Sequence, residues 1–188
     1  MSTYKTICVT DRHLVRGSFI RQIKRALETK PWALILREKD LDRKDYRDLA
    51  EQILPACREN GVLCLFNSRT DLARELSADG VQLPIALAAR LTRKERESLP
   101  LLGVSVHSEE EVREAVEMGA DFLLYGHIFP TQCKPGLAPR GLAGLKRVCA
   151  AAEVPVFAIG GISEKNAPAC IEAGASGVCM MSRFMTME

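Results

Sequence analysis

The 188-residue sequence has no long hydrophobic run and no marked excess of charge of one sign. No stretch approaches the roughly eighteen apolar residues that a membrane-spanning helix needs, and residues 1–13 lack the apolar centre of a signal peptide. The 26 basic and 24 acidic residues give a net charge of +2, and both signs are mixed along the chain. We therefore expect a cytoplasmic protein that binds neither membranes nor nucleic acid.

Cysteine patterns that mark zinc sites or disulfide frameworks are also missing. The cysteines are odd in number and form neither a CxxC motif nor a cluster with histidine. We expect most of them to be buried, reduced and apolar in behaviour. The seven are Cys8, Cys57, Cys64, Cys133, Cys149, Cys170 and Cys179.

Short apolar runs alternate with longer amphipathic ones along the whole chain, which is typical of repeated strand-helix units. With 47% hydrophobic residues, the composition suits one globular domain over residues 1–188. Helical spacing is clearest over 42–59 and over 108–118, where Ser108 is expected to cap the helix and Glu111 to occupy its third position. The predicted strands are 4–10, 32–38, 62–66, 80–83, 102–106, 121–126, 154–160 and 177–181.

Eight such units favour a parallel, eight-stranded (β/α)8 TIM barrel. The main alternative, a doubly wound sheet, needs a glycine fingerprint after the first strand, and residues 8–17 do not supply it. Only residues 182–188 follow the last predicted strand, so the final helix is expected to be shortened or absent. A partner subunit could cover that flank, and we expect a homodimer.

In such a barrel the functional residues follow the carboxyl ends of the strands. Each polar residue found there has a structural explanation when taken alone, and His127 alone is well explained as a satisfied loop histidine. Because the barrel brings these residues to one rim, together they predict a polar site for an anionic small molecule. They are Arg37, Glu38, Lys39, Asn67, Arg69, Gln82, Ser105, His107, His127, Thr131 and Lys134.

The glycine pair in "AIGGIS" removes side chains where a backbone N–H could approach an oxyanion. The loops after strands seven and eight are the usual phosphate site of a barrel. We expect Gly161 and the backbone at Met181 and Ser182 to hold a phosphate. Arg37, Lys39 and Lys134 can then neutralise further negative charge from the opposite side.

Over nearly its whole length the sequence resembles the thiamine phosphate synthase and TenI superfamily of barrels. The resemblance rests on "LREKD", "FNSRTDLARELSADGVQL", "GVSVHSEEEVREAVEMGADFLLYG", "IFPTQCKPGLAPRGL" and "VFAIGGISEKNAPACIEAGASGVCMMS". It implies a phosphate at the glycine-rich end and a thiazole phosphate of thiamin biosynthesis as substrate.

Two branches of that superfamily differ at positions that the sequence lets us compare. Synthases resemble "NDR" after strand three and "GVHLGQED" after strand four, and the resemblance implies that two aspartates there hold Mg²⁺. This chain has Ser68 and Leu87 instead, and neither is a good ligand for a hard cation. Efficient pyrophosphate displacement is therefore not expected.

The other branch, the TenI thiazole tautomerases, is similar in "GVQLP" and in "GHIFPTQCKPGLAPRG", which contains Cys133 and Arg140. This resemblance implies that His127 moves a proton from ring carbon two to an exocyclic carbon, aromatising a 2-carboxy-4-methyl-5-ylidene thiazole phosphate without metal or cofactor. Arg37 or Lys39 is expected to meet the carboxylate, with Gln82 and Asn67 orienting it. No chemical role is expected for Cys133.

The sequence therefore predicts a thiazole tautomerase, an isomerase. Two alternatives stay open. The chain is a thiamine phosphate synthase that joins a pyrimidine pyrophosphate to a thiazole phosphate, or it is a non-catalytic protein that binds a phosphate ligand.

Overall fold

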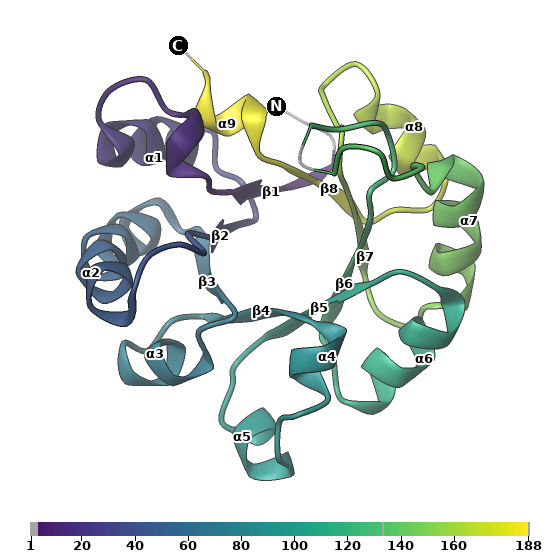
Figure 1. Ribbon diagram of the computed structural model, residues 1–188, viewed down its shortest axis with the longest axis horizontal. Helices are drawn as coiled ribbons and strands as arrows, with labels where there is room; N and C mark the ends of the chain where they lie inside the picture. The colour runs from purple at the N-terminus through teal and green to yellow at the C-terminus, as the bar shows by residue number, and fades with distance from the viewer. Residues whose placement is uncertain (1–3, 133, 188) are drawn as a thin grey trace.

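Eight parallel strands form a closed barrel, and helices surround it (Figure 1). The computed structural model describes residues 4–132 and 134–187. The strands pair in sequence order, and β8 closes the barrel on β1. This confirms the predicted (β/α)8 fold. The strands are β1 Lys5–Val9, β2 Ala33–Leu36, β3 Leu63–Asn67, β4 Gly80–Pro84, β5 Leu102–Val106, β6 Phe122–Gly126, β7 Val156–Ile159 and β8 Gly177–Met180.

Helices follow the strands, and a long connection over residues 127–140 joins β6 to α7. Both long helical predictions are confirmed: Asp42 caps the second helix through Asp45 N (2.8 Å), and Ser108 caps the sixth through Glu111 N (3.2 Å). The helices are α1 Phe19–Glu28, α2 Arg43–Asn60, α3 Thr70–Glu75, α4 Ile85–Ala88, α5 Arg93–Glu97, α6 Glu109–Glu117, α7 Gly141–Ala151, α8 Ala167–Glu172 and α9 Ser182–Met185, with a 3-10 turn at Arg12–Leu14.

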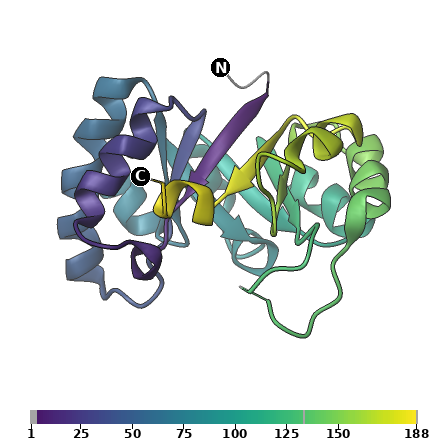
Figure 2. The same cartoon turned by 90° about the horizontal axis from the view of Figure 1, so that it is seen from above.

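The last helix, α9, has only four residues, as the sequence predicted. It lies against α1, at the junction between the first and last parts of the chain (Figure 2). The Gln22 side chain joins the two, because its Nε2 donates to Phe184 O (2.7 Å) and Met187 O (3.0 Å). Phe184 and Met185 are buried there.

Side chains alternate along each strand between the barrel interior and the helices. Ile7 and Val9 point into the interior, whereas Cys8 packs among the helix-facing residues. Near the amino ends of the strands the interior is filled by three aromatic rings. Trp32 stacks on Phe157 with centroids 5.0 Å apart, and Phe122 meets Trp32 edge-on at 5.4 Å.

Glycines opposite these rings make room for them. A Cβ on Gly177 would lie 2.7 Å from Phe157 Cε1, and one on Gly103 would lie 2.8 Å from Phe122 Cε1. Large and small residues therefore interlock at this end of the barrel. The amino end of the barrel interior is therefore closed by packing.

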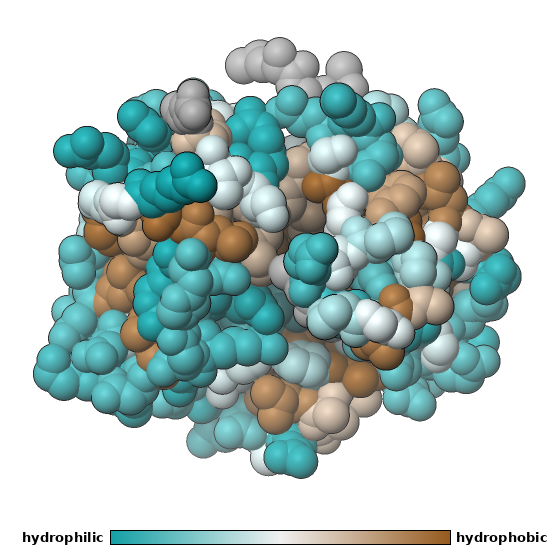
Figure 3. Space-filling model, turned by 45° about the horizontal axis from the view of Figure 1, so that its top comes forward, coloured by the Kyte–Doolittle hydropathy of each residue, from teal (hydrophilic) through white to brown (hydrophobic). Residues whose placement is uncertain are grey.

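The surface and the cysteines agree with the composition. Hydrophilic side chains cover most of the face in Figure 3, with hydrophobic ones in separate patches. No helix in the described part of the chain is long and apolar enough to cross a membrane. The described cysteines are unpaired, and all but the half-buried Cys149 are buried, while Cys133 lies outside the described residues.

Replacing Phe157, which is 1% exposed, with alanine is expected to lower the free energy of unfolding by about 3–5 kcal/mol, because it leaves a cavity between Trp32 and Phe122. Leu137→Ala is the control, since Leu137 is 63% exposed and its loss should change stability by less than about 0.5 kcal/mol. Urea unfolding of both variants tests this. Equal effects would contradict the packing described for the barrel interior.

Candidate active site

A cavity of about 380 Å³ opens at the carboxyl ends of the strands. Alternation along the strands explains which side chains reach it: Ile35 points into the barrel, so Arg37, two residues later, points into the cavity. In the same way Leu65 points into the barrel, and Asn67, two residues later, points into the cavity. The lining of the barrel therefore changes from apolar to polar over two residues at the end of each of these strands.

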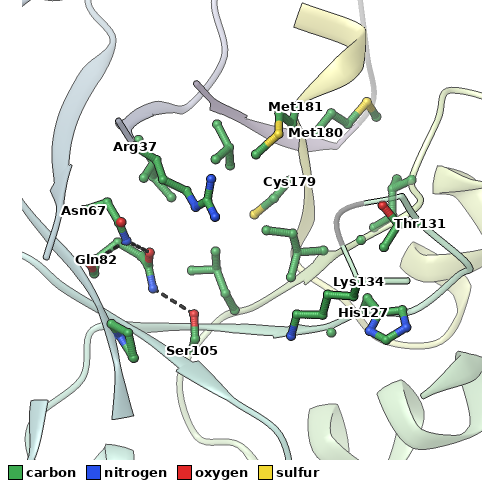
Figure 4. Close-up of a pocket in the computed structure, with 18 of the residues that line it drawn as sticks. Arg37, Asn67, Gln82, Ser105, His127, Thr131, Lys134, Cys179, Met180 and Met181 are labelled. Atoms are coloured by element: carbon green, nitrogen blue, oxygen red, sulfur yellow. Dashed lines mark hydrogen bonds between the residues drawn. The ribbon is translucent and has the colours of Figure 1, made fainter. Parts of the chain in front are cut away.

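The cavity brings together every residue to which the sequence assigned a binding or catalytic role, whereas Glu38 and Arg69 are absent from its described lining. Figure 4 labels Arg37, Asn67, Gln82, Ser105, His127, Lys134 and Met181 among them. The assigned residues come from seven strands or the loops that follow them, so no local stretch of sequence contains the site. The predicted residues that line the cavity are Arg37, Lys39, Asn67, Gln82, Ser105, His127, Lys134, Gly161, Met181 and Ser182. Their roles stay predictions.

Three of the polar residues form a hydrogen-bonded chain across β3, β4 and β5 (Figure 4). Asn67 Nδ2 donates to Gln82 Oε1 (2.7 Å), and Gln82 Nε2 donates to Ser105 Oγ (2.8 Å). Because Ser105 Oγ accepts this bond, its hydroxyl hydrogen is available to a ligand, and Asn67 offers its Oδ1 as an acceptor. The chain thus fixes the orientation of all three side chains.

The charge in the cavity is positive. Arg37, Lys39 and Lys134 line it, and no aspartate or glutamate does so among residues 4–132 and 134–187. The pKa of Lys39 is lowered, first by the positive charge of Arg37, then by burial and by Lys134. A protein with a net charge of only +2 therefore presents a cationic site suited to a polyanion.

Glu38 stands between two of these cations in sequence but not in space. It points away from the cavity and is 2% exposed. Its carboxylate accepts from Thr10 Oγ1 (2.6 Å) and from Arg12 N (3.1 Å). Thr10 Oγ1 in turn accepts from Arg37 N (2.9 Å), so the same network fixes the backbone that carries the cations.

The next carboxylate, Asp40, is also engaged on the β1 side. Arg12 donates to both of its oxygens, and this pairing holds the pKa of Asp40 well below its usual range. His13 Nε2 lies 3.1 Å from Asp40 Oδ2. The acidic residues next to the cation cluster are therefore paired outside it.

The glycine pair after β7 allows two loops to touch. A Cβ on Gly160, whose φ is +95°, would lie 2.7 Å from His127 Cα, and one on Gly161 would lie 2.7 Å from Phe129 O. The loop after β7 thus packs directly against the loop after β6. The predicted phosphate position, at Gly161, Met181 and Ser182, lies on this rim of the cavity.

The sequence did not predict that Cys179 contributes to the site. It lines the cavity and is 2% exposed, and burial raises the pKa of its thiol, which keeps it uncharged. With Ile35, Leu124 and Ile159 it forms an apolar part of the lining. Its register was the available signal, because it lies two residues before Met181 in an inward-facing series.

His127 is held in the structure as a loop residue. It is 6% exposed, its Nε2 lies 3.2 Å from Leu137 O, and its carbonyl accepts from Arg140 N (2.8 Å). Arg140 Nε also donates to Gly126 O (3.0 Å). These bonds close the loop that carries Lys134 over the cavity.

Comparison with known proteins identifies the family. The model described as thiamine monophosphate synthase matches residues 6–184. The chain belongs to this family. A thiamine-phosphate synthase of Desulfitobacterium hafniense strain Y51 is 38% identical, over 98% of this chain and 91% of that protein. A putative thiamine-phosphate synthase 2 of Aquifex aeolicus is 32% identical and is covered over its full length.

Solved structures agree with this assignment to the thiamine monophosphate synthase family. The thiamine phosphate pyrophosphorylase of Pyrococcus furiosus superposes with a TM-score of 0.85 at 32% identity, over 98% of this chain and 89% of that one. FabK of Thermotoga maritima, at 16% identity and a TM-score of 0.71, shares the fold alone.

The prediction of a thiazole tautomerase, an isomerase, is wrong. Relatives at 32–38% identity over nearly the whole chain are named thiamine-phosphate synthases, which are transferases. The prediction depended on the TenI-like motifs around Gln82 and His127 and on the missing aspartates at Ser68 and Leu87. The geometry of His127 explains why that residue was misleading. His127 is buried and bonded to Leu137 O, so a loop role accounts for a histidine at this strand end without proton transfer.

The Mg²⁺ that the family resemblance implies does not fit the residues present. Ser68 lines the cavity but has no charge, and Leu87 lies on α4, outside the described lining residues. Within the described ranges, no group of three or more His, Cys, Asp or Glu residues could hold a metal ion. The site lacks the carboxylate oxygens that this cation prefers.

The lowered pKa of Lys39 predicts how anion binding changes with pH. As the pH rises through that pKa, Lys39 loses its charge, so affinity for an anion falls at a lower pH than an ordinary lysine pKa of 10.5 would give. Titration with sulfate, whose own charge is constant over this range, measures the effect. In Lys39→Arg the loss of sulfate affinity should occur at a higher pH than in the unchanged protein. If the two proteins show the same pH dependence, the role assigned to Lys39 is contradicted.

Proposed function

We propose that this chain is a thiamine-phosphate synthase, joining a thiazole phosphate to a pyrimidine pyrophosphate. The observation that carries the proposal is the match, at 32–38% identity over 98% of the chain, to proteins named for that activity. The cavity supports it independently, because the reaction brings two phosphorylated molecules together and the described lining is cationic without a carboxylate.

The substrates can be assigned to two sides of the cavity. We place the pyrophosphate against Arg37, Lys39 and Lys134, and the phosphate of the thiazole at the rim formed by Gly161 and Ser182. The rings then lie over the apolar part of the lining. The chain of Asn67, Gln82 and Ser105 orients a ring through its one donor and one acceptor.

The bond changes need charge stabilisation more than proton transfer. The lone pair of the thiazole nitrogen forms a bond to the carbon that carries the pyrophosphate, and the carbon–oxygen bond breaks with its electron pair going to pyrophosphate. The ring nitrogen becomes positive, and no proton moves. Fixed cations beside the departing oxygen lower the energy of this transition state.

A second candidate function is phosphate-ligand binding without turnover. The residues at positions 68 and 87 favour it, because Ser68 and Leu87 leave no carboxylates at the places where the resemblance implies a metal. The motifs that contain Gln82, His127 and Lys134 still resemble those of the TenI branch. We therefore propose that the sequence is related to that branch. A homodimer and a cytoplasmic location stay predictions.

Formation of thiamine phosphate from the two substrates, followed with and without Mg²⁺, tests the proposal. Lys134→Ala is expected to lower kcat/KM by about 10- to 100-fold, the effect of losing one charge-assisted contact to the leaving group. Lys146→Ala, at an exposed position on α7, should leave the rate unchanged. Binding of thiazole phosphate without turnover under any condition would support the second candidate instead.

We assign His127 as a positioning residue for the loop that carries Lys134. His127→Ala should raise KM for the pyrophosphate substrate by about tenfold, because a neutral hydrogen bond and the loop order that depends on it are lost. His127→Gln, which keeps an N–H donor, should restore much of the loss. Disappearance of one limb of the pH–rate profile in both variants would instead indicate acid/base chemistry.

A further inference from the structure

The sequence "REKD" looks electrically balanced, but the segment that continues from the end of β2 separates its charges. Alternation sends Arg37 and Lys39 to the cavity and Glu38 to the opposite side, where Thr10 and Arg12 bind it. Asp40 is held by Arg12 as well. The cations on the β2 side of the cavity thus have no carboxylate partner inside it among the described residues.

Lys134 adds positive charge from a different element, the loop after β6 (Figure 4). The three cations are close enough for Arg37 and Lys134 both to lower the pKa of Lys39, which shows mutual repulsion in the free site. Such repulsion is relieved by a bound polyanion. A divalent cation placed among them would increase the repulsion instead.

Position 68 strengthens this conclusion. Ser68 lies on the cavity lining with a φ of +58°, a left-handed conformation that aspartate and asparagine adopt more readily than most residues. Its side chain is exposed, so the backbone and the available space would both accept an aspartate. The missing carboxylate is therefore a property of this sequence and is not imposed by the fold.

We propose that this cavity binds the pyrophosphate group directly through Arg37, Lys39 and Lys134, without a divalent cation. This inference rests on the proposed function for the identity of the ligand. It also sets the direction of a metal effect: Mg²⁺ in solution binds pyrophosphate and reduces its negative charge, so it competes with the protein cations for the ligand.

Calorimetric titration with inorganic pyrophosphate tests the inference on the intact chain. With EDTA present we expect measurable binding, and excess Mg²⁺ should leave the Kd unchanged or raise it. No binding in EDTA, or a Kd at least about tenfold lower with Mg²⁺, a gain of roughly 1.4 kcal/mol, would overturn the inference. Lys134→Ala should raise the Kd in EDTA by about tenfold or more, whereas Lys146→Ala should not change it.

The double variant Ser68→Asp, Leu87→Asp restores carboxylates at the two positions where the family resemblance implies Mg²⁺ ligands, and it tests whether pyrophosphate binding then responds to Mg²⁺. Both positions are exposed, so the variant is expected to fold, and a melting curve checks this. Its affinity for pyrophosphate should rise by about tenfold on adding Mg²⁺, in contrast to the unchanged protein. If the variant responds to Mg²⁺ as the unchanged protein does, these positions are not where metal dependence was lost, and that part of the inference is wrong.

A parallel assay of thiamine phosphate formation separates the two proposals. Metal-free pyrophosphate binding without product formation would refute the proposed function and leave the binding inference standing. Product formation combined with pyrophosphate binding that requires Mg²⁺ would refute the inference and leave the proposed function standing.

Discussion

Side-chain alternation along parallel strands is the constraint on which the site depends. A closed parallel barrel points the carboxyl end of every strand at one cavity, and alternation then decides which residues reach it. Below the cavity the same series of inward positions is filled by Phe122 and Phe157, and Trp32, which precedes β2, stacks on Phe157. One repeating rule therefore produces both the packed interior and the polar site above it.

The same rule separates charges that are adjacent in sequence. Glu38 is buried between Thr10 and Arg12, while its neighbours Arg37 and Lys39 face the cavity. The buried Glu38 carboxylate accepts three hydrogen bonds, one from Thr10 and two from Arg12, so its hydrogen-bonding capacity is satisfied. It anchors the backbone from which Arg37 and Lys39 project. The electrostatic character of the site thus depends on a network whose members, Thr10, Arg12 and Glu38, are absent from the described lining of the cavity.

His127 shows how a single conspicuous residue can mislead. Its likeness to the TenI branch at this strand end implied proton transfer. In the structure its ring is bonded to the Leu137 carbonyl and its backbone to Arg140, so it organises a loop. Likeness over nearly the whole chain outweighs one position: a thiamine-phosphate synthase is 38% identical over 98% of the chain, and a thiamine phosphate pyrophosphorylase superposes with a TM-score of 0.85.

The sequence by itself determined the order of strands and helices, the closed barrel and the set of residues at its rim, because hydrophobic period and strand-end position are local properties. It also showed the absence of carboxylates at Ser68 and Leu87. Only the tertiary structure decided that Glu38 leaves the cavity, that Cys179 joins it and that His127 bonds a loop carbonyl. Those outcomes depend on contacts between residues far apart in the chain, which no local pattern encodes.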